Sequence, residues 1–107
     1  MIFAATTTDI YLLRKCLELW GLNAQIYKVF EETAELNVEL AKGLNNDLNF
    51  DSPKLVDEIA DVYIMLHSLA YGLRVNEDVN KRVEYKMERL CLLVSRGTFD
   101  VTQERRS

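Results

Sequence analysis

The chain has 107 residues, 49% of them hydrophobic, and its 17 acidic and 13 basic residues give a formal net charge of −4. This length predicts one domain, and the apolar content argues against a disordered chain. The acidic balance argues against a nucleic-acid backbone as the main partner, because such a site needs a net basic surface.

Four helical segments are predicted in chain order, with glycines between them. The first covers about residues 8–20 and is closed by Gly21, and the second covers about residues 24–42 and is closed by Gly43. Glycine is often the residue just past a helix end. Apolar residues recur in both segments at helical spacing, so each is expected to have a buried face.

The third and fourth segments complete the predicted fold. The third starts at Ser52-Pro53, with Ser52 as the N-cap and Pro53 at the first helical position, and runs to about residue 71. The fourth covers about residues 76–96. We therefore expect an all-α fold, with the segments arranged as a four-helix bundle.

The bundle is expected to occupy residues 1–97, with a polar C-terminal tail at residues 98–107. No segment approaches the ~20 apolar residues of a membrane span. The start of the chain lacks the basic and long apolar regions of a signal peptide. A cytoplasmic protein that does not bind membranes is therefore expected.

Acidic side chains interrupt the second and third segments, which are otherwise mostly apolar. On each segment they fall within an arc of about 100° when placed at helical spacing. Most of the i,i+4 spacings join acid to acid, which is unfavourable when the groups are desolvated. The members are Glu31, Glu32, Glu35 and Glu39 on the second segment and Asp57, Glu58 and Asp61 on the third.

A positive group is expected among these acids. Lys28 falls within the same arc of the second segment, but one lysine cannot neutralise so many carboxylates. A hard divalent cation such as Mg²⁺ takes oxygen ligands and fits the remainder, whereas Zn²⁺ is not favoured because the cluster contains no Cys or His. The alternative is an acidic stripe that faces solvent.

The same acids match a family signature. The sequence resembles the MazG-like all-α nucleoside triphosphate pyrophosphatases, whose pattern is EExxE, a spacer and ExxD. The first half here is Glu31–Glu35, the second is Glu58–Asp61, and the runs EETAEL, VDEIADV and YKMERL also resemble the family. The similarity covers about residues 12–96. It implies a bundle that assembles as a homodimer or tetramer.

The resemblance also implies the parts of a catalytic site. Glu32, Glu35, Glu58 and Asp61 correspond to Mg²⁺ ligands, with Mn²⁺ as a substitute. Glu31 corresponds to the general base. The implied reaction is the attack of water on the α-phosphorus of a (d)NTP, which gives the (d)NMP and pyrophosphate.

Basic and aromatic residues are candidates for binding the nucleoside triphosphate. The resemblance points to Lys28, Lys86 and Arg89 for the phosphates. Trp20 is a candidate for stacking on the nucleobase, with a core anchor as the alternative, and Gln25 for contacting a base edge or a phosphate. His67 lies roughly opposite the acidic arc, so a structural role is expected for it.

Two other functions stay open at this point. The chain could be a related hydrolase of dUTP, dCTP or phosphoribosyl-ATP, with the same metal site and a different base pocket. It could also be a non-catalytic helical module whose acids bind a basic partner. The second segment is apolar on more than one side, so apolar surface would remain for a second copy to cover.

Overall fold

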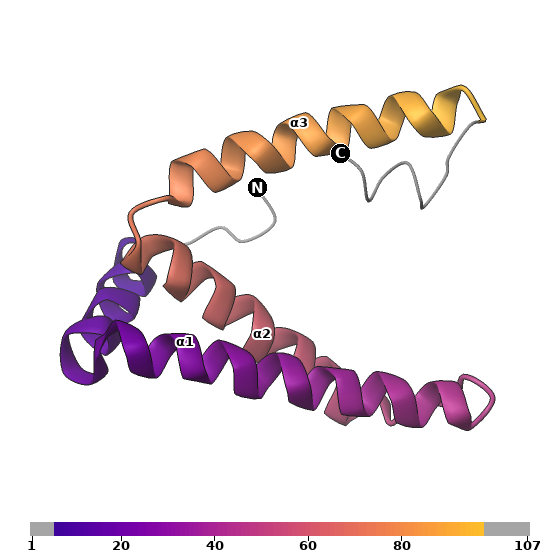
Figure 1. The fold of residues 1–107 in the computed structure, drawn as a ribbon, viewed down its shortest axis with the longest axis horizontal. Helices are drawn as coiled ribbons and strands as arrows, with labels where there is room; N and C mark the ends of the chain where they lie inside the picture. Colours follow the sequence, from indigo (N-terminus) through magenta and orange to yellow (C-terminus); the bar gives the residue numbers. More distant parts are fainter. Residues whose placement is uncertain (1–5, 98–107) are drawn as a thin grey trace. The chain divides into compact units, whose positions relative to one another are not determined.

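The computed structural model describes residues 6–97. Within this range it contains no strand and three α-helices: α1 (Thr7–Asn45), α2 (Ser52–Gly72) and α3 (Asn76–Ser95), as Figure 1 shows. The chain divides into two compact units, one containing α1 and α2 and the other containing α3. The predicted tail at residues 98–107 lies outside the described residues.

Helix α1 starts at a capping box. The hydroxyl of Thr6 accepts a hydrogen bond from the backbone N–H of Asp9, and the carboxylate of Asp9 accepts one from the N–H of Thr6. Two of the backbone donors that a helix start leaves without a partner are thereby satisfied. The observed start lies within one residue of the predicted one.

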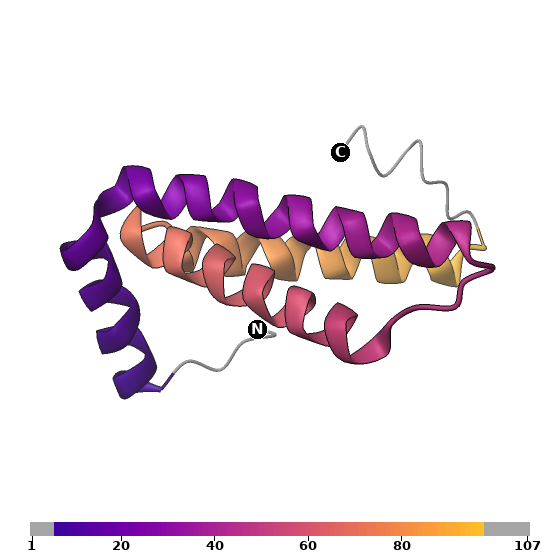
Figure 2. The ribbon, with the colours of Figure 1, turned by 90° about the horizontal axis from the view of Figure 1, so that it is seen from below.

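The first two predicted helices are two helical parts of α1 that meet at Gly21, so the described residues contain three helices and the predicted four-helix bundle is not supported. Gly21 has φ 81° and ψ 164° inside α1, a conformation that is open almost only to glycine. The residues on both sides are helical, so the helical path is interrupted and bends at Gly21, the position predicted to close the first helix. Figure 2 shows this bend between the two straight parts of α1.

The turn between α1 and α2 depends on Gly43 and Phe50. Gly43 is buried in α1, and a Cβ atom added to it would overlap the ring of Phe50. The absence of a side chain therefore lets the chain fold back closely against the helix. Asp51, and not the predicted Ser52, is the N-cap of α2, because its carboxylate accepts the N–H of Lys54.

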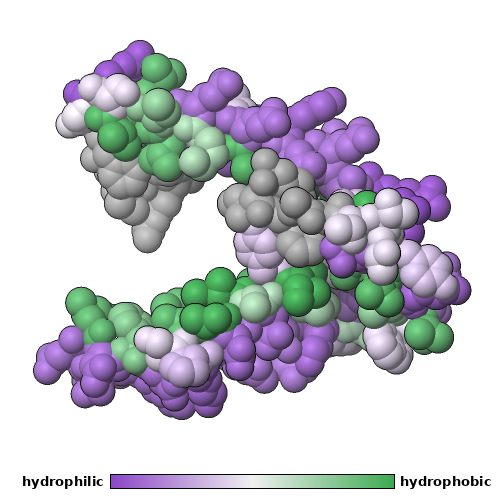
Figure 3. All heavy atoms as spheres, turned by 180° about the vertical axis from the view of Figure 1, so that it is seen from behind, coloured by the Kyte–Doolittle hydropathy of each residue, from purple (hydrophilic) through white to green (hydrophobic). Residues whose placement is uncertain are grey.

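The side chains that α1 and α2 bury fully are polar. No hydrophobic residue among those described is fully buried. Large apolar side chains are exposed on all three helices, among them Tyr27, Val56 and Met87, and Figure 3 shows exposed hydrophobic residues in the α1–α2 unit. The buried polar side chains are those of Gln25, Glu32, Glu39, Glu58 and Ser68.

Helix α3 has no buried residue. Glu77 and Asp78 lie in its first turn, where negative charge is favoured by the helix dipole. Its bounds agree with the predicted fourth segment to within one residue. None of the three helices has a stretch of the length and hydropathy that a membrane crossing requires.

Candidate functional site

Helices α1 and α2 run antiparallel and bring two acidic patches of the sequence together. Gln25 of α1 is hydrogen-bonded to Ser68 of α2, and Glu39 of α1 is ion-paired with Lys54 of α2. Each step forward along α1 is therefore matched by an equal step back along α2. The acids of both helices lie between these two contacts, so they face one another.

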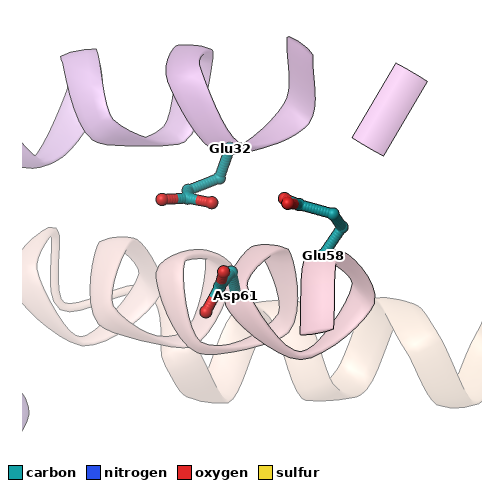
Figure 4. A group of neighbouring side chains, drawn as sticks. All are labelled: Glu32, Glu58 and Asp61. Atoms are coloured by element: carbon teal, nitrogen blue, oxygen red, sulfur yellow. The ribbon is translucent and has the colours of Figure 1, made fainter. Parts of the chain in front are cut away.

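Three carboxylates form the centre of the site. One carboxylate oxygen from each of Glu32, Glu58 and Asp61 lies within 4.8 Å of the others. Figure 4 shows that Glu32 projects from α1 and that Glu58 and Asp61 project from α2 into the same space. We refer to these residues as the acidic triad. All three were predicted as metal ligands.

The acidic triad is an unfavourable arrangement without a cation. Glu32 is 6% exposed and Glu58 is 9% exposed, and Oε2 of each is buried without a hydrogen-bond partner among the described residues. Burial, followed by the negative charges of Glu35, Glu32 and Asp61, raises the pKa of Glu58 above its usual value of 4.5. A bound cation would offset both the burial and the repulsion.

The other two predicted acids lie next to the triad. Glu35 is exposed, and after burial its negative charge is the next cause that raises the pKa of Glu58, so it lies beside the triad. The side chain of Glu31 is also exposed and is 3.4 Å from Nζ of Lys28. The structure thus gathers the five predicted acids around one place, with Glu31 at the edge.

Lys28 supplies a positive charge at the edge of the triad. Its Nζ is 3.0 Å from a carboxylate oxygen of Glu32 and 3.4 Å from one of Glu31. The hydrogen bond to Glu32, followed by the negative charge of Glu31, raises the pKa of Lys28. Lys28 neutralises part of the acidic charge and leaves Glu58 and Asp61 without a basic partner among the described ion pairs.

A mainly apolar hollow of about 320 Å³ lies beside Lys28 and is lined by both parts of α1 and by α2. Trp20 lines this hollow and is 65% exposed, so the indole is not a core anchor in this structure. Leu13 lies before the kink at Gly21 and Ile64 lies on α2. We refer to this hollow as the Trp20 hollow.

Gln25, the other candidate for base contact, has a structural contact that the sequence did not predict. It is fully buried, and its Nε2 donates a hydrogen bond to Oγ of Ser68. Its Oε1 has no hydrogen-bond partner among the described residues. Both residues also line the Trp20 hollow.

The remaining candidates lie away from the triad or in the other unit. Lys86 and Arg89 are on α3, where Lys86 is exposed and Arg89 half-buried. His67 is half-buried, its ring centroid is 5.2 Å from that of Tyr63, and burial lowers its pKa. The structural role expected for His67 stays a prediction.

A second hollow of about 370 Å³ lies on the side of the triad away from the Trp20 hollow. It is lined by Glu35, Glu39, Glu58, Lys42 and Lys54, with Val38. The sequence placed Glu39 outside the family signature, and it did not indicate a role for the two lysines. The signal was present, because Glu39 is one turn beyond Glu35 on the same face of the helix.

The comparisons with known proteins give no further assignment. No family model, no curated protein and no solved structure matches this chain.

Proposed function

We propose that the chain is a Mg²⁺-dependent nucleotide pyrophosphohydrolase of the MazG-like kind, which cleaves (d)NTPs to (d)NMP and pyrophosphate. The observation that carries this proposal is the acidic triad. Its carboxylates come from two helices, and buried oxygens of Glu32 and Glu58 have no partner among the described residues. The resemblance of the two acidic motifs to the family signature supports the same assignment.

The proposed metal ligands are Glu32, Glu58 and Asp61 of the triad, joined by Glu35. Carboxylate oxygens without sulfur or imidazole ligands are the donor set that Mg²⁺ prefers, and Mn²⁺ accepts the same set. A bound Mg²⁺ would polarise the phosphate and lower the pKa of a coordinated water. The backbones of α1 and α2 fix the position of the ligands.

The other proposed roles follow from position. Glu31 is exposed beside the triad, where it can take the proton of the attacking water as the oxygen of that water bonds to the α-phosphorus. The bond from this phosphorus to the departing pyrophosphate breaks in the same step. Lys28 would offset negative charge on the phosphate. The family resemblance alone points to Lys86 and Arg89 as further phosphate-binding residues, and both lie in the other unit.

The Trp20 hollow is proposed to hold the nucleobase. Its lining is mainly apolar, it has the size range of small-molecule sites, and the exposed indole of Trp20 offers a face for stacking. Lys28 lines the same hollow and is paired with Glu32 of the triad. A base in this hollow would therefore place its phosphates next to the acids.

We also propose that the protein assembles as a homodimer or tetramer. No hydrophobic residue described is fully buried, and large apolar side chains are exposed on every helix. Such surface is unusual for a monomeric protein and is commonly covered by a partner. Sedimentation equilibrium tests this proposal: a monomer mass at every protein concentration would contradict it.

Mg²⁺ titration by calorimetry and a nucleotide panel test the enzymatic function. Glu32→Gln and Glu58→Gln should each weaken Mg²⁺ binding by at least about 100-fold, since the loss of even an outer-shell partner costs 10–100-fold. Asp57→Asn is the matched control, because Asp57 is an exposed neighbour of Glu58 outside the triad. This variant should bind Mg²⁺ like the wild type.

The panel contains the common (d)NTPs, with dUTP, dCTP and phosphoribosyl-ATP, and the measured products are monophosphate and pyrophosphate. Turnover by the wild type and its loss in Glu32→Gln would support the proposal, and the panel identifies the preferred base. Folded, Mg²⁺-loaded wild type that hydrolyses none of these compounds would contradict it. Salt-sensitive binding of a basic partner would then favour the non-catalytic module.

A further inference from the structure

The second hollow contains two lysines held by one buried carboxylate. Oε2 of Glu39 lies 3.3 Å from Nζ of Lys42 and 3.5 Å from Nζ of Lys54. Glu39 is 6% exposed, while the side chains of both lysines are more than half exposed. Glu39 thus holds both ammonium groups in place, and they remain accessible to a ligand.

The two lysines carry more positive charge than Glu39 needs. One carboxylate neutralises one ammonium group, so the cluster of Glu39, Lys42 and Lys54 has a surplus of one positive charge. Glu35 and Glu58 line the same hollow and offset this surplus while they are free. A divalent cation bound by the four proposed ligands would cancel two of their four negative charges, which leaves more of the positive charge of the lysines for an anion.

The position of the lysines indicates which anion would bind there. The Trp20 hollow and the second hollow share no lining residue, and Lys28 at the edge of the former is paired with Glu32 of the triad. Glu58 of the triad also lines the second hollow. Glu39 lies seven residues beyond Glu32 on α1, which is about 10 Å along the helix at 1.5 Å per residue. The lysines therefore lie beyond the triad from the Trp20 hollow, on the side that the far end of a triphosphate would face.

We infer that Lys42 and Lys54 bind the pyrophosphate end of a nucleoside triphosphate, at the opposite side of the acidic triad from the Trp20 hollow. This inference rests on the proposed function. It gives the site a direction, with the base beside Lys28, the α-phosphorus at the triad and the departing pyrophosphate against Lys42 and Lys54. An ammonium group is a strong donor to phosphate oxygens.

The test is the binding of inorganic pyrophosphate, measured by calorimetry with Mg²⁺ in fixed excess. Lys42→Gln and Lys54→Gln should each weaken pyrophosphate binding by about fivefold to tenfold, the scale of one charge-assisted contact. Binding of a nucleoside monophosphate should change by less than about twofold, because that ligand lacks the pyrophosphate end. Lys28→Gln should show the reverse, with weaker binding of the nucleoside monophosphate and little change in the binding of pyrophosphate.

Lys15→Gln is the matched control. Lys15 forms an ion pair of 3.1 Å with Glu18 on the part of α1 before the kink, so its replacement also breaks a helix ion pair and removes one positive charge. It should leave pyrophosphate binding unchanged. An equal loss in this variant would show that only net charge matters, and the inference would fail.

A companion variant guards against loss of the fold. Removing both lysines leaves Glu39 buried and unpaired, so Lys42→Gln/Lys54→Gln is accompanied by a triple variant that also carries Glu39→Gln. A folded triple variant that binds pyrophosphate like the wild type would overturn the inference, and so would wild type that does not bind pyrophosphate. If the wild type hydrolyses nucleotides and the lysine variants bind pyrophosphate unchanged, the inference about Lys42 and Lys54 is overturned while the enzymatic function stands.

Discussion

Gln25 of α1 donates a hydrogen bond to Ser68 of α2, and both side chains are fully buried. This contact and the ion pair between Glu39 and Lys54 lie on either side of the acidic triad. A shift of α2 by one residue would break both. The polar contacts therefore fix the position of α2 along α1. Apolar contacts alone would fix this position less strictly.

Replacement of Ser68 by alanine is expected to destabilise the α1–α2 unit. It leaves Nε2 of Gln25 buried without its acceptor, and an unsatisfied buried donor costs about 1–3 kcal/mol. Chemical denaturation measures the change in the free energy of unfolding. Wild type should be the most stable, the double variant Gln25→Leu/Ser68→Ala less stable and Ser68→Ala the least stable. The double variant is less affected than Ser68→Ala because it no longer contains a polar group in need of a partner.

Ser95→Ala is the control for this experiment. Ser95 donates a hydrogen bond to the backbone oxygen of Cys91 on α3, where it is exposed, so the lost bond can be replaced by water. Its cost should be under about 0.5 kcal/mol, as for most surface substitutions. If Ser68→Ala costs no more than Ser95→Ala, the contact does not contribute to the stability of the unit.

Glu58 should make the stability of the metal-free protein depend on pH. Burial and the negative charges of Glu35, Glu32 and Asp61 raise its pKa above 4.5, so the folded state binds this proton more tightly than the unfolded state does. The resulting stabilisation is fully present below pH 4.5 and is lost as the pH rises through the raised pKa. At pH 7 the charged carboxylate opposes folding.

Glu58→Gln should therefore raise the melting temperature of the metal-free protein at pH 7 by a few degrees, a scale that small changes in stability produce in a domain of this size. The gain should disappear as the pH is lowered towards 4.5, where the wild-type carboxyl group is protonated. Asp57→Asn removes one negative charge from the same helix outside the triad and should show a smaller change. Equal melting temperatures for Glu58→Gln and wild type at pH 7 would contradict this prediction.

Much of the fold could be predicted because local signals carry it. The Ser52-Pro53 start, the stop near Gly72 and the bounds of α3 all lie within one or two residues of the predicted positions. These signals depend on backbone chemistry that a residue has wherever it stands. That the acids of the triad lie on the acidic arcs of two helices could also be predicted from helical spacing, while their role as metal ligands stays a prediction.

Long-range features could not be predicted in the same way. A glycine with positive φ can separate two helices or join two helical parts at a bend, so the local sequence predicts the interruption at Gly21 and not the bend. The contact between Gln25 and Ser68 and the pairing of Glu39 with Lys54 depend on the register of two helices. Periodicity within one helix shows which residues share a face and not which residue lies opposite.

The kink at Gly21 offers a way to separate the Trp20 hollow from the acidic triad. Residues from both sides of the kink line the hollow, whereas the triad lies entirely beyond it. Any side chain at Gly21 is strained, because φ 81° with ψ 164° is a conformation that costs other residues about 1–3 kcal/mol. Gly21→Ala should relieve this strain by changing the bend, which moves Trp20 away from Lys28.

Gly21→Ala is therefore expected to weaken binding of a nucleoside monophosphate by about tenfold, since loss of base stacking costs about 1–3 kcal/mol. Calorimetric binding of Mg²⁺ should stay within about twofold of wild type, because the triad does not depend on the bend. Gly97→Ala is the control: Gly97 also has a positive φ, of 65°, but lies past the end of α3. A parallel loss of Mg²⁺ and nucleotide binding in Gly21→Ala would mean that the two parts of α1 act as one unit, and the hollow could not then be treated as separate from the metal site.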